Sequence, residues 1–182
     1  GRVFCVNIRK ESDVCRSLPI GLENAALNAN GKMSLYLDDM ALPTDAERKR
    51  MVLASFHVET NPQIRMRVAE EMRASRHGFD GVKWKRGEYR QELRNTLFVI
   101  SPPGNGLDCH RTWEAMILGA VPVVLRDALA PSLLRDSPIL AVDDYRQFLR
   151  LRDAELRELY QEVRTRAMDK ALASFWIREI GV

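Results

Sequence analysis

Short, continuously apolar runs alternate with helical stripes over most of the chain. The clearest runs are "TLFVIS" at Thr96–Ser101 and "VPVVL" at Val121–Leu125, and each predicts a strand. Weaker strands are predicted at Met51–Val58, Gly81–Trp84 and Ile139–Asp143. Strands that are apolar throughout, without a polar residue at every second position, are typical of a parallel sheet covered on both faces.

The segments between these runs have helical periodicity. In Gln63–Ser75 the apolar residues recur at Ile64, Val68 and Met72, which share one helix face. Further helices are predicted at Gly87–Asn95, Cys109–Gly119, Ala130–Ser137 and Ala154–Phe175, the last as one long helix. This alternation predicts an α/β fold, a Rossmann-like parallel sheet with helices on both faces.

The first part of the chain is less regular. Strands are predicted at Val3–Ile8 and Met33–Asp39, with a loop between them. We expect residues 1–43 to be a linker and the remnant of a preceding domain, and residues 44–182 to form the Rossmann-like domain. The chain starts at Gly1 inside an apolar run, so we expect a fragment or a processed product.

Composition narrows the class of protein only slightly. The 182 residues, 46% hydrophobic and 29% charged, suit one globular domain, and the net charge of +3 is scattered along the chain. That charge suits arginines that bind a small anion as well as it suits a nucleic-acid surface. The three cysteines have no zinc-binding spacing; Cys5 and Cys15 bridge in an oxidising compartment or, as we expect, stay free. No apolar run is long enough for a membrane span, and no signal peptide is visible.

The turn after Thr96–Ser101 is the strongest candidate for a binding site. Gly104 and Gly106, around Asn105, permit positive φ and a close backbone approach to a ligand. The helix that follows, capped by Asp108 and ended by Gly119, directs free N–H groups toward the turn.

Two charged residues strengthen this candidate. Arg111 in the first helical turn adds a cation for a phosphate, and Glu114 adds an acceptor for sugar hydroxyls. The alternative is a common strand-to-helix turn, with Arg111 and Glu114 paired on a helix surface.

Other candidates lie near the same edge of the predicted sheet. His57 ends a strand, Arg65 begins the next helix, and His110 begins the helix after the glycines. Lys83, in a stretch that mixes basic and aromatic residues, is a candidate contact for a nucleobase. We expect no metal site, because His57-x-Glu59 has no partner cysteines.

A longer motif surrounds the glycines. "SPPGNGLDCHRTWEAMILGAVPVV" resembles the segment SP-x-G-(D/N)-G…R-x-(W/F)-E-A-x3-G-x-x-P-(V/I)-(V/I) of exostosin-type glycosyltransferases. The matching positions are Ser101, Pro102, Gly104, Asn105, Gly106, Arg111, Trp113, Glu114, Ala115, Gly119, Pro122, Val123 and Val124. The resemblance is good over Tyr89–Val124 and looser over Leu18–Asp144.

The resemblance implies the GT-B architecture, two Rossmann-like domains that face each other across a cleft. This chain resembles the C-terminal, donor-binding half. The implied reaction is inverting, metal-independent transfer of a hexose or pentose from a nucleotide diphosphate sugar to a glycan or glycoconjugate, without another cofactor and without nucleic acid. Arg111 would face the diphosphate and assist its departure, while Glu114 would face the ribose. The catalytic base and the acceptor would belong to an N-terminal domain, and Asn105 departs from the Asp of many members.

Two other functions remain open on the residues alone. One is a non-catalytic module that binds a nucleotide or an anion. The other is a nicotinamide-dependent oxidoreductase, because "GNGLDC" approximates G-x-G-x-x-G; against it, Cys109 replaces the third glycine and at least two strands precede the turn. The compartment follows from the source: cytoplasm for a bacterial or viral protein, Golgi lumen for a eukaryotic one.

Overall fold

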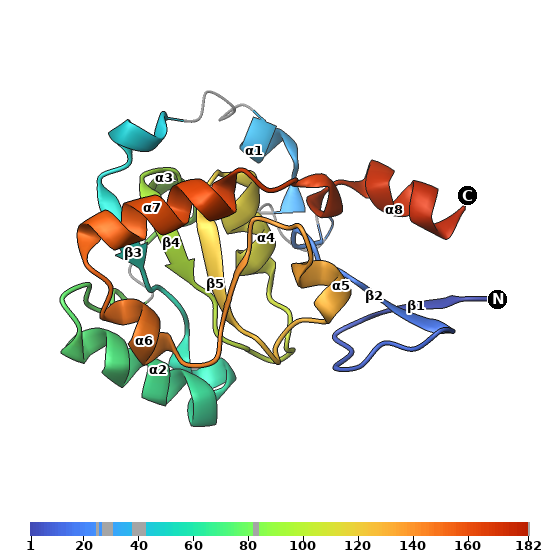
Figure 1. Ribbon diagram of the computed structural model, residues 1–182, viewed down its shortest axis with the longest axis horizontal. Helices are drawn as coiled ribbons and strands as arrows, with labels where there is room; N and C mark the ends of the chain where they lie inside the picture. The colour runs from blue at the N-terminus through green and yellow to red at the C-terminus, as the bar shows by residue number, and fades with distance from the viewer. Residues whose placement is uncertain (25, 27–30, 38–42, 82–83, 182) are drawn as a thin grey trace.

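The core of the protein is a parallel sheet of four strands (Figure 1). The computed structural model describes all 182 residues except 25, 27–30, 38–42, 82–83 and 182. The strands are β3 (Arg50–Leu53), β4 (Thr96–Ile100), β5 (Val121–Leu125) and β6 (Leu140–Val142), in the order β3-β4-β5-β6. Each neighbouring pair is parallel, so all four carboxyl ends lie at one edge of the sheet.

Helices cover both faces of this sheet (Figure 1). The helices of the described residues are α1 (Ser34–Leu37), α2 (Pro62–Ala74), α3 (Arg86–Arg94), α4 (His110–Ile117), α5 (Pro131–Leu134), α6 (Tyr145–Leu149), α7 (Asp153–Arg164) and α8 (Ala173–Ile180). Of these, α8 extends away from the sheet, beside β1 and β2 (Figure 1). On one face, Phe98 of β4 packs against Phe148 of α6 and Tyr160 of α7. On the other, Val99 packs with Leu93 of α3 and with α4. The predicted Rossmann-like α/β fold is confirmed.

The predicted long C-terminal helix is wrong. Helix α7 ends at Arg164, and a short 3-10 turn at Asp169–Ala171 precedes α8. The Thr165 hydroxyl donates to the carbonyl of Glu162 at 2.8 Å, a local bond that competes with helix continuation. After this break, Trp176 packs against a hydrophobic cluster that includes residues of α5. Packing against this cluster places α8 apart from α7.

The N-terminal part also differs from prediction. Residues Ser34–Leu37 are helical rather than extended, because Tyr36 inserts into the core beside α3 and α4 and is 2% exposed. A strand that the pattern did not reveal, β2 (Cys15–Leu18), pairs in parallel with β1 (Val3–Val6). All three cysteines are free thiols, as expected.

Two predicted strands have different outcomes. The strand predicted at Met51–Val58 ends at Leu53, and a 3-10 turn occupies Val58–Thr60. The strand predicted at 81–84 falls partly on residues 82–83, outside the described part of the chain. Among the described residues, no helix combines the length and apolar character needed to span a membrane.

One buried arginine joins three ends of this core. Arg48 is 1% exposed and has no carboxylate in its hydrogen bonds. Its guanidinium donates to the carbonyls of Leu93, Thr96 and Leu118 at 3.3, 2.9 and 3.0 Å. The carbonyl of Leu93 lies near the end of α3, that of Thr96 at the start of β4 and that of Leu118 at the end of α4. Arg48 therefore binds carbonyl groups at the ends of these elements, where regular hydrogen bonds are lacking.

We predict that Arg48→Met lowers the free energy of unfolding by about 3 kcal/mol, because three buried carbonyls lose a charged donor. Urea denaturation measures the change, and Lys49→Met at the neighbouring exposed position is the control, with an expected effect below about 0.5 kcal/mol. Equal stability of the two variants would show that Arg48 does not join these elements.

Candidate functional site

Arg65 donates side-chain hydrogen bonds to the glycine-rich turn after β4, and Asn61 adds one to the carbonyl of Gly104 at 3.1 Å. Arg65 of α2 is 5% exposed, and its five N–H donors all have protein acceptors. The acceptors are the carbonyls of His57, Pro102 and Pro103, the hydroxyl of Thr60 and the sulfur of Cys109. The bonds to Pro103 and His57 measure 2.9 and 2.8 Å. Arg65 thus fixes the turn relative to the end of β3, and the predicted contact of Arg65 with a ligand stays a prediction.

The glycines of this turn make room for side chains. A Cβ on Gly104 would lie 2.6 Å from Nη2 of Arg65, and a Cβ on Gly106 would lie 2.6 Å from Oδ1 of Asn7. Neither glycine has a positive φ, so that part of the prediction is wrong, and the close approach of a ligand to their backbone stays a prediction. Their lack of a Cβ lets Arg65 and Asn7 approach the backbone.

Helix α4 starts without the predicted aspartate cap. Its N-cap residue is Cys109, and the Asp108 carboxylate is directed elsewhere. The indole N–H of Trp113 donates to both carboxylate oxygens at 2.9 Å, and the amide of Ile20 donates at 2.8 Å. The carboxylate of Asp108 therefore binds Trp113 in the core and the backbone of a loop at Ile20. At its other end the helix is followed by Gly119, with φ of 82°, as predicted.

The N-terminal segment clamps the start of α4. The Asn7 side-chain oxygen accepts from the amide of Asp108 at 2.7 Å, in addition to the bond from Ile20. The ring Nδ1 of His110 lies 2.8 Å from the carbonyl of Gly21. The region expected to be a linker therefore supplies part of the wall of the site.

In the described part of the chain, the guanidinium of Arg111 lacks a hydrogen bond at one of its nitrogens. Its Nε is buried and has no hydrogen-bond partner among the described residues. Its guanidinium carbon lies 5.8 Å from the centroid of the Phe56 ring, and that of Arg65 lies 5.5 Å from the same centroid. Burial, and then the nearby charge of Arg111, lower the pKa of Arg65. The two guanidinium groups beside one ring repel each other, while the carboxylate of Glu114 interacts with the charge of Arg111.

Glu114 lies one turn further along α4 and is 8% exposed. The hydroxyl of Tyr36 donates to its Oε1 at 3.2 Å, and no described residue donates to Oε2. Burial raises the pKa of Glu114, and the charge of Arg111 opposes that rise. Burial also raises the pKa of Tyr89 to about 12, with Arg111 again opposing. Glu114 and Arg111 thus share a partly buried polar cluster with two tyrosines.

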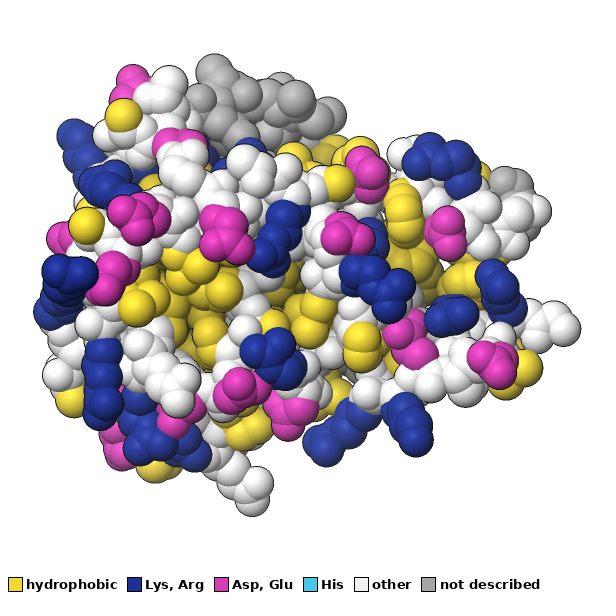
Figure 2. Space-filling view, in the orientation of Figure 1, with side chains coloured by type: hydrophobic (Ala, Val, Ile, Leu, Met, Phe, Trp, Pro, Cys, Tyr) yellow, Lys and Arg dark blue, Asp and Glu magenta, His cyan; other side chains and the backbone are white. Residues whose placement is uncertain are grey.

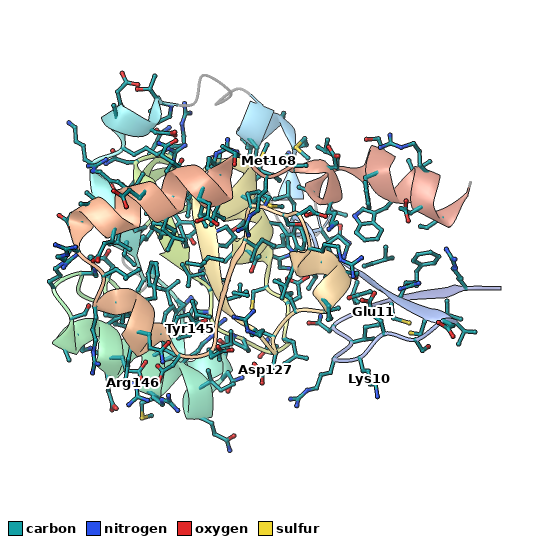
Figure 3. All side chains as sticks on the ribbon, viewed as in Figure 1. Lys10, Glu11, Asp127, Tyr145, Arg146 and Met168 are labelled. Atoms are coloured by element: carbon teal, nitrogen blue, oxygen red, sulfur yellow. The ribbon has the colours of Figure 1, made fainter. Side chains whose placement is uncertain are left out.

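A cavity of about 440 Å³ lies at the carboxyl ends of β5 and β6. Asp127 and Tyr145, both labelled in Figure 3, line it. The Tyr145 side chain is 2% exposed, and its hydroxyl has no hydrogen-bond partner among the described residues. Burial raises the pKa of Tyr145, while the charges of Arg111 and Arg65 lower it. Tyr145 therefore lines this cavity and also lies near Arg65 and Arg111.

The structure brings together most of the predicted site residues. Those that meet around the turn and the start of α4 are Arg65, Gly104, Gly106, His110, Arg111 and Glu114. Asn105 is exposed at the tip of the turn, and the His57 side chain is 65% exposed beside Glu59. Lys83 lies outside the described residues. Among the described residues no cluster of His, Cys, Asp or Glu could hold a metal ion.

Sequence reasoning missed four residues of this site: Asn7, Tyr36, Tyr89 and Tyr145. Tyr145 had a signal because it directly follows the acidic pair after the apolar run "ILAV", and Tyr89 opens the stretch in which the family resemblance is good. Asn7 and Tyr36 come from segments whose position depends on tertiary packing.

The buried Asp108 predicts a pH dependence. Burial raises the pKa of Asp108 from 3.8 to about 6, although hydrogen bonds from Ile20 and Trp113 lower it. Because the folded-state pKa lies above the unfolded value, the stability from this group is full below pH 4 and is lost as the pH rises through about 6. Relative to Asp108→Asn, the wild type should lose about 2–3 kcal/mol of unfolding free energy between pH 4 and 7. Urea denaturation at several pH values measures this difference, and parallel profiles for the two proteins would contradict it.

The comparison with protein families covers this same region. The chain matches the Exostosin GT47 domain over residues 36–148, more than half of its length. The matched region contains the sheet, the glycine-rich turn, Arg65, Arg111 and Glu114. No curated protein matches the chain. The chain belongs to the Exostosin GT47 domain family, a family of glycosyltransferases.

Proposed function

We propose that this chain is the donor-binding part of an inverting, metal-independent glycosyltransferase. It binds a nucleotide diphosphate sugar, and the sugar, a hexose or pentose, passes to a glycan or glycoconjugate. The observation that carries the proposal is Arg111, whose buried Nε has no hydrogen-bond partner in the described part of the chain and lies beside a second, fully occupied arginine. A diphosphate is the part of such a donor that satisfies this charge.

Arg111 assists the reaction as the leaving group departs. Negative charge grows on the diphosphate while the bond to the sugar breaks, so a fixed cation stabilises the transition state more than the bound donor. Arg65 adds positive electrostatic potential nearby, although all its N–H groups donate to acceptors within the protein. Arginine and backbone donors suffice for this work, which is why the proposal includes no metal ion.

Glu114 binds the ribose in this proposal. Its Oε1 accepts from Tyr36, which orients the carboxylate, and Oε2, to which no described residue donates, accepts from a ribose hydroxyl. Because Arg111 and Glu114 are separated by one helical turn, one face of α4 contacts both the diphosphate and the ribose. His110, Gly104, Asn105 and Gly106 border the donor; His57 and Lys83 are proposed at its outer edge.

The acceptor and the catalytic base complete the proposal. A domain that precedes this chain would hold both, across a cleft from α4, and residues 1–43 would connect to it. The base removes the proton of the acceptor hydroxyl, and that oxygen displaces the diphosphate in one step, which inverts the anomeric centre.

We predict that Arg111→Ala weakens binding of UDP and GDP, whichever binds the wild type, by at least about tenfold, because a charge-assisted contact is lost. Arg111→Lys should keep part of the affinity, since it retains charge without the planar fork. Isothermal titration calorimetry measures both variants, and Arg157→Ala on the exposed side of α7 is the matched control.

The same titrations are made in EDTA and with Mg²⁺ or Mn²⁺. Affinity that is independent of metal supports the proposal, and a strict metal requirement contradicts it. Wild-type affinity in a folded Arg111→Ala variant would remove Arg111 from the donor site. In a two-domain form of the enzyme, binding without any sugar transfer would identify a non-catalytic module instead.

We predict that Glu114→Gln weakens nucleoside diphosphate binding by about 1–3 kcal/mol, because the amide mispairs with a ribose hydroxyl. Inorganic pyrophosphate, which has no ribose, should bind wild type and variant equally. Calorimetry with both ligands separates the ribose contact from a general disturbance of α4. An equal loss for pyrophosphate would show that Glu114 acts on the fold of the site.

A further inference from the structure

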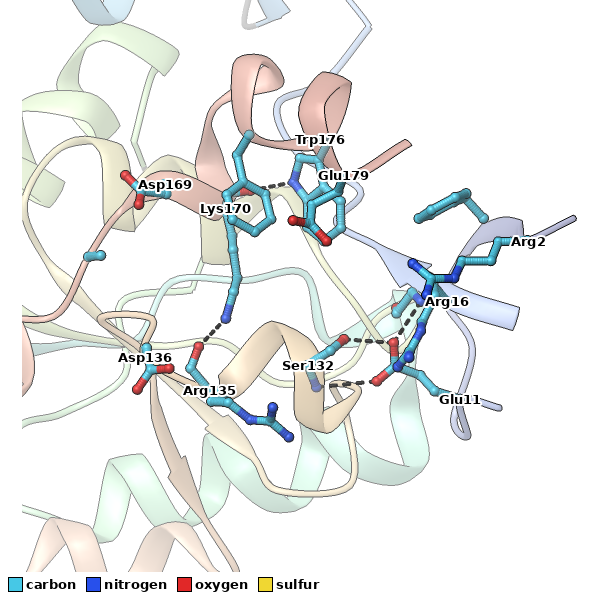
Figure 4. A pocket seen from close by; sticks show the side chains of 14 residues that line it. Arg2, Glu11, Arg16, Ser132, Arg135, Asp136, Asp169, Lys170, Trp176 and Glu179 are labelled. Atoms are coloured by element: carbon cyan, nitrogen blue, oxygen red, sulfur yellow. Dashed lines mark hydrogen bonds between the residues drawn. The ribbon is translucent and has the colours of Figure 1, made fainter. Parts of the chain in front are cut away.

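A second cavity, of about 480 Å³, lies between the β1–β2 sheet, α5 and α8 (Figure 4). Neither Arg111 nor Glu114 lines it, and the proposed donor site does not use it. Figure 2 shows hydrophobic side chains gathered between α8 and the N-terminal strands, with charged side chains around them. The cavity therefore combines an apolar wall with a charged rim.

Aromatic rings form the apolar wall. Phe4 of β1 and Phe175 and Trp176 of α8 line the cavity, and all three are half-buried. The rings of Phe175 and Trp176 meet edge to face, with centroids 5.0 Å apart. The indole N–H of Trp176 donates to the carbonyl of Lys170 at 2.8 Å, so the orientation of this ring is fixed.

A fixed carboxylate faces these rings across the cavity. Glu11 accepts from the Ser132 hydroxyl at 2.7 Å, from the Ser132 amide at 3.3 Å and from the Ser17 amide at 2.9 Å (Figure 4). Arg2 and Glu179 line the rim and have no side-chain hydrogen bond or ion pair with any described residue. These groups offer donors and acceptors to a ligand at several directions around the rings.

The charges of the cavity balance. The basic residues that line it are Arg2, Arg16, Arg135 and Lys170, and the acidic ones are Glu11, Asp136, Asp169 and Glu179. A polyanion such as a nucleic acid would meet the acidic groups, and a cationic peptide would meet the basic ones. A ligand with an apolar face and many neutral hydroxyls meets both the rings and the mixed charges favourably.

We propose that this cavity binds a neutral oligosaccharide. A sugar ring stacks its C–H face on Trp176, while its hydroxyls donate to Glu11 and accept from Arg2. The proposal rests on the proposed function in one respect: a glycosyltransferase that acts on a glycan gains from a second contact with it. Ser17 lines the cavity, and Ile20, which binds Asp108 of the donor site, is three residues further on, a span of about 10 Å.

The test is binding of neutral tetrasaccharides, cellotetraose, xylotetraose and maltotetraose, to the full chain, measured by ligand-observed NMR. At least one should bind, and Trp176→Ala should weaken it by about tenfold or more. Ile177→Ala, at the next position of α8 but exposed and outside the cavity, is the matched control and should bind normally. Glu11→Gln should also weaken binding while the aromatic wall remains.

Nucleoside diphosphate titrations of the same variants separate the two proposals. Trp176→Ala should keep its affinity for the nucleotide, which also shows that it is folded, and Arg111→Ala should keep its affinity for the tetrasaccharide. Failure of all three tetrasaccharides to bind would overturn the glycan site, as would equal binding by wild type and Trp176→Ala. Tighter, salt-dependent binding of tetragalacturonate would also overturn it, because the site would then select acidic chains. Normal nucleotide binding by Arg111→Ala would instead overturn only the donor site.

Discussion

The guanidinium of Arg65 is the contact on which the candidate site depends. It is almost fully buried and gives every N–H to an acceptor in the segment His57–Thr60 that follows β3, in the turn after β4 or at the N-cap of α4. Hydrogen bonds from a charged donor are each worth more than neutral ones, and they must offset the cost of burying the charge. Because the bonds come from one rigid planar group, they fix the geometry of the turn as a unit.

This constraint explains the composition of the turn. The guanidinium fills the space where a side chain at Gly104 would begin, so glycine is needed there for packing. Asn7 has the same relation to Gly106 and also binds the amide of Asp108. While Arg65 gives all its N–H groups to the protein, Arg111 keeps a buried Nε that has no hydrogen-bond partner among the described residues. The two guanidinium groups repel each other, and the diphosphate of the proposed donor would reduce that repulsion.

Much of the sheet and part of the site follow from local patterns. The strands at Thr96–Ile100 and Val121–Leu125 and helix α4 coincide with apolar periodicity and with the glycine that ends the helix. The position of Arg111 one turn into α4 follows from the same pattern. Local sequence therefore predicts which element carries a residue.

What local sequence does not predict is the partner of that residue. Asp108 looks like a helix cap, yet Trp113 and Ile20 bind it because the N-terminal segment crosses this end of α4. Tyr36 lies in an apolar-looking stretch with strand-like alternation, but it reaches Glu114 from a helix. The bonds from Ile20 to Asp108 and from Tyr36 to Glu114 join residues 88 and 78 positions apart, which periodicity does not contain.

A crystal structure of the chain with UDP or GDP, grown in the presence of EDTA, tests the central claim most directly. The account predicts the diphosphate within hydrogen-bonding distance of the Arg111 guanidinium, near the turn at Gly104–Gly106, and the ribose hydroxyls on the Glu114 carboxylate. A nucleotide bound elsewhere, with Arg111 facing solvent or protein alone, would contradict it.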